Sequence, residues 1–162
     1  MLGLLVFGLA TQFMFSQTEE LPEVRLDINY KYLDAIESDD VALSVKELEE
    51  EVAFFNVKES DMYEAYLDNY TVSFFIPKGR IVAIYNKDGK IEQTIERFKN
   101  IRLPISVMSR ILEQYPNWDI VEDTYKVDYY DRRGVTQKQY KVKLKNKDKI
   151  KTVKLDEDGQ YL

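Results

Sequence analysis

The chain of 162 residues contains neither cysteine nor histidine. Without histidine there is no Ser-His-Asp or Cys-His pair to activate a nucleophile, and without both residues the common zinc, haem and iron–sulfur sites are excluded. The groups that remain for catalysis are carboxylates, lysine and tyrosine, together with cations bound by oxygen. A chain of this length buries enough surface to fold without disulfides. The two absences therefore make an enzyme a less favoured class.

The apolar run at the N terminus, MLGLLVFGLATQFMFSQ, is about fourteen residues long before the sequence turns polar. A membrane-spanning helix needs about 20 residues, and the run matches the core of a secretory signal. We therefore expect residues 1–17 to be a signal peptide; a buried first element of the fold is the alternative. Export without cysteines predicts a bacterial envelope protein, either periplasmic or associated with the outer membrane.

Charge is distributed unevenly along the chain, whose net charge is −6. Residues 17–70 contain sixteen acidic and four basic side chains, whereas residues 131–154 contain ten basic and two acidic ones. This asymmetry favours either an anionic partner at the basic segment or contact between the two segments within the fold. Nucleic acid is not an expected partner, because the chain is acidic overall and has no recognition helix. An anionic membrane surface is an alternative partner.

Apolar residues alternate from Val24 to Tyr32, which predicts an N-terminal strand. Ser44 and Glu47 have the spacing of a capping box and predict the start of a helix. The glutamates between 47 and 51 are expected on the solvated side of this helix, and its apolar stripe consists of Val45, Leu48, Val52 and Phe55. Strands are predicted over 70–76, 80–86 and 90–98, with hairpin turns at 77–79 and 87–89.

A second helix is predicted to begin at 103–105, where Pro104 lies in the first turn, and to end before Pro116. Its expected apolar stripe consists of Ile105, Met108, Ile111, Leu112 and Tyr115. Strand patterns over 118–131, 136–147 and 149–155 follow. Residues 43–57 are similar to 103–120, and residues 81–91 to 150–162, which indicates two copies of one unit.

The predicted fold class is therefore α+β, with two tandem repeats. Residues 21–99 form the first repeat with its N-terminal strand, and residues 100–162 form the second. In each repeat a helix packs on one face of an antiparallel β-meander, and the other face is open. Trp118 corresponds to Val57 of the first repeat, so we expect it to pack beneath the second helix and cover the end of the core.

Alternation along the strands predicts which side chains lie on the open face. Those expected to contact a partner are Phe75, Lys126, Tyr130, Lys141, Lys143 and Lys145. Rigid aromatic rings among long cationic side chains are typical of protein-binding surfaces. The alternative is an ordinary solvated face whose lysines discourage pairing with other sheets.

No catalytic residue, metal site or cofactor is expected. The Asp-Gly sequences at 88–89 and 158–159 lack the ligand number and spacing of a calcium loop and are typical of hairpin turns. Adjacent glutamates on a helix point around it and do not converge, so residues 47–51 do not indicate acid–base catalysis.

Several short patterns resemble a known family: Tyr-Pro-x-Trp-x-Ile at 115–120, Tyr-x-Val at 125–127, a strand rich in tyrosine and lysine, and Asp-x-x-Gly at 156–159. This order resembles the PepSY-like, β-lactamase-inhibitor-like exported proteins of Bacteroidetes, and residues 21–24 and 29–33 resemble the start of a flavobacterial subgroup. The resemblance implies tandem helix-on-sheet repeats, secretion to the periplasm or beyond, and a protein-binding or inhibitory role. A nucleotidyltransferase, a name used within the subgroup, is not expected, because the chain lacks the histidine-containing phosphate site and the alternating βαβ pattern.

The function that we expect is that of a non-catalytic exported module, which binds a protein partner of the cell envelope through the open sheet face. One alternative is an accessory structural subunit of an envelope complex. The other is a carboxylate- or metal-dependent enzyme, for which a deep pocket with converging acids would be the evidence.

Overall fold

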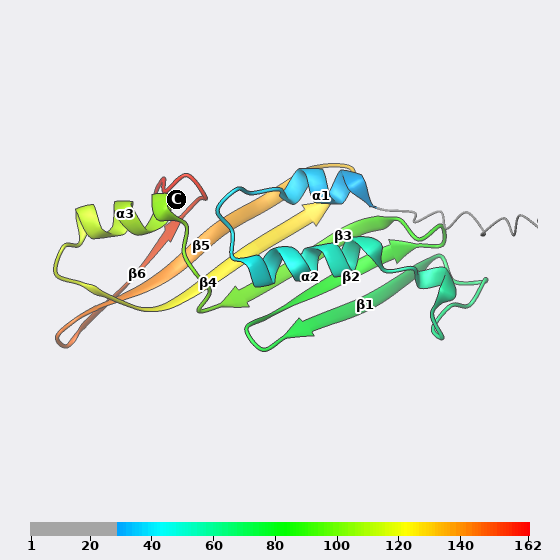
Figure 1. The fold of residues 1–162 in the computed structure, drawn as a ribbon, viewed down its shortest axis with the longest axis horizontal. Helices are drawn as coiled ribbons and strands as arrows, with labels where there is room; N and C mark the ends of the chain where they lie inside the picture. Colours follow the sequence, from blue (N-terminus) through cyan, green and yellow to red (C-terminus); the bar gives the residue numbers. More distant parts are fainter. Residues whose placement is uncertain (1–28) are drawn as a thin grey trace, which may run out of the picture.

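The structure is a computed structural model that describes residues 29–162. These residues form three α-helices, one short 3-10 helix and six strands. The strands make one antiparallel sheet in the order β1-β2-β3-β4-β5-β6, and the helices lie along one face of it (Figure 1). The predicted α+β class with an antiparallel sheet is confirmed. The predicted signal peptide lies outside the described residues.

Helix α1 (Tyr30–Ile36) occupies the end of the stretch that was predicted to be a strand. That prediction is wrong for residues 30–32, and residues 24–28 lie outside the described part of the chain. An alternating strand would place Tyr30 and Tyr32 on the same face, but Tyr30 is 65% exposed whereas Tyr32 is buried. The next buried residue is Ile36, four positions on, which is the helical period.

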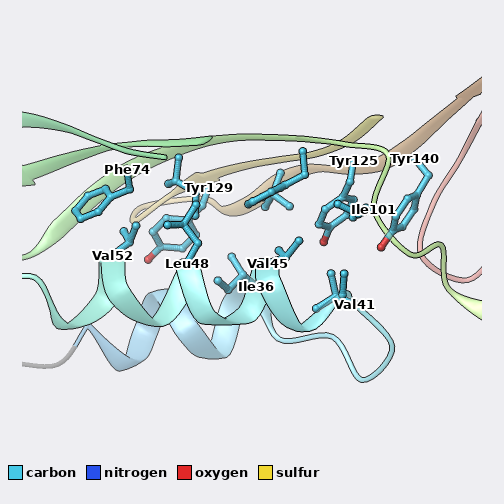
Figure 2. Packing of buried hydrophobic residues seen from close by; sticks show 14 of the residues in the cluster. Ile36, Val41, Val45, Leu48, Val52, Phe74, Ile101, Tyr125, Tyr129 and Tyr140 are labelled. Atoms are coloured by element: carbon cyan, nitrogen blue, oxygen red, sulfur yellow. The ribbon is translucent and has the colours of Figure 1, made fainter. Parts of the chain in front are cut away.

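Helix α2 (Leu43–Phe54) begins one residue before the predicted cap. Ala42, which is buried and extended, is the N-cap residue, and no side chain caps the helix. The predicted capping box of Ser44 and Glu47 is therefore wrong, because Ser44 already lies inside the first turn. The predicted apolar stripe is confirmed for Val45, Leu48 and Val52, which point from α2 into the core (Figure 2). The 3-10 helix η1 (Val57–Glu59) follows.

The six strands are β1 (Asn69–Ile76), β2 (Gly79–Asn86), β3 (Ile91–Lys99), β4 (Asp119–Tyr130), β5 (Gly134–Asn146) and β6 (Lys149–Leu155). They agree closely with the predicted strand patterns, because apolar and polar residues alternate along each of them. The turn between β2 and β3 is stabilised by Asn86, whose Oδ1 accepts from the amides of Asp88 and Lys90 at 2.9 and 3.0 Å. Gly89 has a φ of 82° in that turn, which explains the glycine.

The core lies between the sheet and the helices, and tyrosine supplies much of it. Tyr85, Tyr125, Tyr129 and Tyr140 are almost completely buried on the inner face. The rings of Tyr125 and Tyr140, on neighbouring strands, stack with centroids 4.5 Å apart (Figure 2). The predicted inward orientation of Tyr125, Tyr129 and Tyr140 is therefore confirmed.

The sheet continues across the predicted repeat boundary at 99/100. Strand β3 pairs with β4 over seven positions, from Gln93 with Tyr130 to Lys99 with Thr124. Helix α2 contacts β1 and β2, whereas α1 contacts β4 and β5. The two halves of the chain therefore share one sheet and one core.

Helix α3 (Ile105–Gln114) lies at the β6 end of the molecule (Figure 1). It buries Val107 and Ile111, so the predicted stripe is correct for Ile111. The stripe is wrong for three other apolar residues, which are 65%, 39% and 51% exposed: Ile105, Met108 and Leu112. The helix packs near the end of the sheet, where Ser106 Oγ donates to the Glu157 carbonyl at 2.7 Å, and the sheet covers only a narrow part of it.

Trp118 is partly buried and packs against the core, with its ring edge-on to Tyr115 at a centroid distance of 6.0 Å. It lies between the end of α3 and the start of β4, and its amide donates to the Tyr115 carbonyl at 3.1 Å. Trp118 thus lies at the junction of helix and strand, as predicted, but it is not fully enclosed.

Candidate functional site

The open face of the sheet consists of the side chains that alternate with the buried ones. All three helices lie on the other face. Helices α1 and α2 cover the buried tyrosines. Helix α3 lies on the same side, because Lys151, the strand partner of the buried Leu144, places its Nζ 4.8 Å from the centroid of the Tyr115 ring at the end of α3. Within the described residues, the open face therefore has no covering layer.

The structure places all six predicted partner-contact residues on this open face. Phe75 is 68% exposed on β1, at the edge of the sheet. Lys141 and Lys145 on β5 are exposed, whereas Lys126 on β4 is partly exposed. Lys143 is engaged by Glu122, with Nζ 3.7 Å from Oε2, and Tyr130 carries the Arg133 guanidinium 4.4 Å above its ring.

These six residues do not converge on one position. Phe75 is separated from the lysines by β2 and β3. Tyr130 lies at the end of β4 that pairs with Gly134, whereas Lys143 and Lys145 pair with Glu122 and Asp119 near the other end. The six predicted residues therefore share one face of the sheet but do not form one compact site.

A more continuous feature crosses the strands, and three of its members were missed by the sequence analysis. Arg80 pairs directly with Arg97, and Arg97 pairs directly with Lys126. On the next two strands Lys141 pairs directly with Lys154. We call these five residues the basic stripe: Arg80, Arg97, Lys126, Lys141 and Lys154. They come from five successive strands, about 4.8 Å apart, so the stripe spans roughly 19 Å.

Like charges face one another within the basic stripe. The charge of Arg97 is the main reason that the pKa of Lys126 is lowered, and Lys141 and Lys154 act in the same direction. Asp128 partly offsets this effect, and its Oδ1 lies 3.9 Å from Arg97 Nη1. Directly opposed like charges destabilise a sheet, so an anion that binds across the stripe would relieve repulsion.

Apolar side chains adjoin the stripe on the open face. Val82 pairs directly with Ile95 on the neighbouring strand, and both are partly exposed, as is Ile84. Phe75 pairs directly with Arg80 at the start of the stripe. The open face therefore combines an apolar area on β1–β3 with a cationic path toward β6.

A second feature, which the sequence analysis did not predict, is a pair of buried carboxyl groups. Glu49 on α2 is 5% exposed and Glu96 on β3 is completely buried. The two carboxyl groups are close enough for the charge of Glu96 to raise the pKa of Glu49, and Glu49 Oε1 and Glu96 Oε2 are both buried with no hydrogen-bond partner among the described residues. Glu96 Oε1 accepts from Tyr32 Oη at 2.9 Å and from Thr94 Oγ1 at 2.8 Å. We call Glu49 and Glu96 the carboxyl pair.

Burial determines the protonation of the carboxyl pair. Loss of solvation is the largest cause that raises the pKa of both carboxyl groups, and the charge of Glu96 raises the pKa of Glu49 further. The charge of Lys138 on β5 lowers the pKa of Glu49, but its Nζ binds Glu157 Oε2 at 2.6 Å and the Glu37 carbonyl at 2.9 Å. The carboxyl pair therefore keeps one proton, because two neighbouring buried carboxyl groups cannot both be ionised without a large cost.

The expectation that residues 47–51 form a solvated face is wrong for Glu49. The burial of Glu49 could have been predicted from the sequence, because Glu49 is four residues after Val45 and three before Val52 and so lies on the apolar stripe of α2. Glu96 likewise alternates with Thr94 and Phe98 on the inner face of β3. The proximity of the two carboxyl groups could not be predicted from the sequence, because it depends on how α2 crosses β3.

Access to the carboxyl pair is narrow. Glu49 contributes to the wall of a hollow of about 300 Å³ between α1 and α2, together with Leu33, Ile36, Val41 and Lys46. Glu96 has no exposed surface. Converging acids are thus present, but a substrate could not contact both of them in this conformation. No group of three or more acidic side chains among residues 29–162 is arranged to hold a metal ion.

These features define an α+β protein with one six-stranded antiparallel sheet, helices on one face and a cation-lined open face. Comparison of the chain with protein-family models, curated proteins and solved structures finds no match. Within residues 29–162, no helix is long and apolar enough to cross a membrane.

Proposed function

We propose that this protein is a non-catalytic exported module that binds a protein partner through the open sheet face. The observation that carries the proposal is the basic stripe, which crosses five neighbouring strands on a face that nothing in residues 29–162 covers. Aromatic and cationic side chains on a rigid surface are suited to protein recognition. The partner segment would be acidic, because charge complementarity guides both encounter and register.

An extended acidic segment fits the stripe better than a compact anion. The five cations form a path rather than a cluster, and among the described residues Arg97 is the stripe member with an ion pair at 4.0 Å or less. The remaining cations are therefore available to carboxylates of a partner. The adjacent apolar area at Val82 and Ile95 would take apolar side chains of the same partner.

The carboxyl pair supports a non-catalytic role. An acid–base pair has to come within hydrogen-bond reach of the reacting group, and Glu96 has no exposed surface. The absence of histidine and cysteine from the sequence agrees with this proposal.

We also propose that the chain consists of two PepSY-like repeats. The order of elements supports this, since α2 precedes β1, β2 and β3 and α3 precedes β4, β5 and β6. The unequal packing of α2 and α3 would then reflect divergence, with α1 covering the second half of the sheet. Export to the periplasm or outer membrane belongs to the same proposal. An alignment of relatives in which the two halves resemble each other more closely would test the duplication.

Binding of a synthetic acidic peptide tests the proposed function. The probe is a fluorescently labelled oligoglutamate, and its affinity is measured by anisotropy for the wild type and for Lys141→Glu/Lys154→Glu. We expect at least a tenfold loss for this variant and a steep decrease in affinity with salt, because the opposed lysines supply adjacent charges. The matched control is Lys58→Glu/Lys87→Glu, which makes the same net change at exposed residues outside the stripe.

Equal losses in both double variants would show a nonspecific charge effect and contradict the proposal. Absence of binding to the peptide, with binding to phosphatidylglycerol vesicles that depends on Lys141 and Lys154, would instead favour the anionic membrane surface. Circular dichroism of each variant checks that the fold is unchanged.

A further inference from the structure

Glu49 and Glu96 are the two most deeply buried carboxyl groups of the described residues, and they take no part in the proposed binding. The carboxyl pair joins two different layers, because Glu49 belongs to α2 and Glu96 to β3. Tyr32 adds a third element, since its hydroxyl on α1 donates to Glu96 Oε1 at 2.9 Å. Helix α1 is therefore joined to Glu96 by a hydrogen bond, and α2 places the carboxyl group of Glu49 where the charge of Glu96 affects it.

We propose that the proton shared by Glu49 and Glu96 is a pH-sensitive lock, whose loss at alkaline pH releases α1 and α2 from the sheet. The proposal is independent of what the open face binds. It concerns the opposite face of the sheet and predicts a local opening of the helix layer.

The geometry favours a proton between the two carboxyl groups. Glu49 Oε1 and Glu96 Oε2 are both inaccessible and have no hydrogen-bond partner among the described residues. Tyr32 and Thr94 both donate to the remaining oxygen of Glu96. A carboxylate placed against a second carboxylate in a dry interior is strongly unfavourable, whereas a carboxylic acid can donate to a carboxylate.

The charged and titratable groups around the pair do not supply a replacement for the proton. On α2, Lys46 lowers the pKa of Glu49, as does Lys138 on β5, but both effects are smaller than that of burial. Asp128 on β4 adds negative charge that raises the pKa of Glu96. The other ionisable groups facing the pair are tyrosines, of which Tyr32 on α1, Tyr85 on β2 and Tyr125 on β4 all have raised pKa values.

Removal of the proton would place two negative charges between α2 and β3. The helix layer is the part that can move, because the sheet is held by continuous strand pairing on both sides of β3. Opening would hydrate both carboxylates and expose the apolar stripe of α2 at Val45, Leu48 and Val52. A surface hidden at neutral and acidic pH would then become available at alkaline pH.

Hydrogen–deuterium exchange followed by mass spectrometry tests the lock in the full chain. Protection factors, corrected for intrinsic exchange, are compared at about pH 6 and about pH 9.5, on either side of the expected transition. For the wild type we expect at least a tenfold loss of protection in Tyr30–Phe54 at the higher pH and little change in β4 and β5. Glu49→Gln should remove this dependence, because its amide can donate to ionised Glu96 without a titrating proton. Glu47→Gln, at an exposed position of the same helix, should behave as the wild type.

The same pH dependence in Glu49→Gln and wild type would overturn the proposal, and so would equal loss of protection in β4 and β5. If Glu49→Gln fails to fold, carboxyl ¹³C NMR of the wild type decides the question. Titration of every glutamate in the ordinary range, near about 4.3, would exclude a retained proton. One carboxyl group that titrates well above that range, together with the local loss of protection, would support the lock.

Discussion

At the scale of single residues, tyrosine supplies much of the core of this protein, because five of the largest fully buried side chains are tyrosines. A buried hydroxyl group loses its hydration, and this loss destabilises the fold unless the hydroxyl group has a hydrogen-bond partner. Tyr85 Oη donates to the Val52 carbonyl at 2.6 Å and so connects β2 to α2. Tyr140 differs, since its hydroxyl is buried and has no hydrogen-bond partner among the described residues.

This difference predicts opposite effects for the same substitution. Tyr140→Phe should leave the free energy of unfolding unchanged or raise it by up to about 1 kcal/mol, because an unsatisfied hydroxyl is removed. Tyr85→Phe should lower it by about 1–2 kcal/mol, because the Val52 carbonyl loses its donor. Urea titrations followed by the fluorescence of Trp118 measure both values. A loss in Tyr140→Phe as large as that in Tyr85→Phe would show that the Tyr140 hydroxyl has a partner.

At the scale of elements, the start of β2 depends on close contact with β3. Gly79 pairs directly with Phe98, which is completely buried. A Cβ at position 79 would lie 2.1 Å from Phe98 Cδ1. The glycine is therefore required by the ring beside it, and the hairpin of β1 and β2 can approach β3 only without a side chain there.

Gly79→Ala should destabilise the protein by about 1–3 kcal/mol, because Phe98 has to leave its position in the packed core. The control is Gly134→Ala, where the added Cβ meets no atom within 4 Å but φ is +71°, so that only about 1 kcal/mol of backbone strain is expected. Thermal denaturation by circular dichroism compares the two. Equal stability of Gly79→Ala and the wild type would mean that the ring can move at little cost.

At the scale of the whole molecule, the uneven charge of the sequence becomes a difference between the two faces of the sheet. Acidic side chains gather on the helix side, where Asp34, Glu37, Asp39 and Asp158 contribute to one polar hollow. Most lysines of residues 141–154 lie on the opposite, open face. The two charged segments therefore do not neutralise each other over most of their length, although Lys138 reaches the helix side and binds the Glu37 carbonyl.

Global stability should also depend on pH, through the carboxyl pair. Burial raises the pKa of Glu49 to about 9, so the folded protein keeps a proton that the unfolded chain releases above the ordinary carboxyl range, about 4.3. The stabilisation is complete below that range and is lost as pH rises through the raised pKa. We expect the free energy of unfolding to fall between about pH 5 and about pH 9, by up to about 1.4 kcal/mol per pH unit for one proton.

Urea titrations across this range measure the dependence, and Glu96→Gln is the comparison variant because it removes one member of the pair. The free energy of unfolding of Glu96→Gln should change clearly less steeply with pH than that of the wild type. A stability that increases from about pH 5 to about pH 9 in the wild type would contradict the assigned protonation.

The sequence by itself determined the strands, the face that each side chain takes and most of the core, because alternation of apolar and polar residues is a local property that one register satisfies. It therefore placed Phe75, Lys126 and Lys141 on the open face. It could not place Arg80, Arg97 and Lys154 in line with them, because the stripe depends on the register between strands. The tertiary structure alone brought Glu49 to Glu96 and turned residues 30–36 into a helix, since both outcomes depend on contacts between segments that are far apart in the chain.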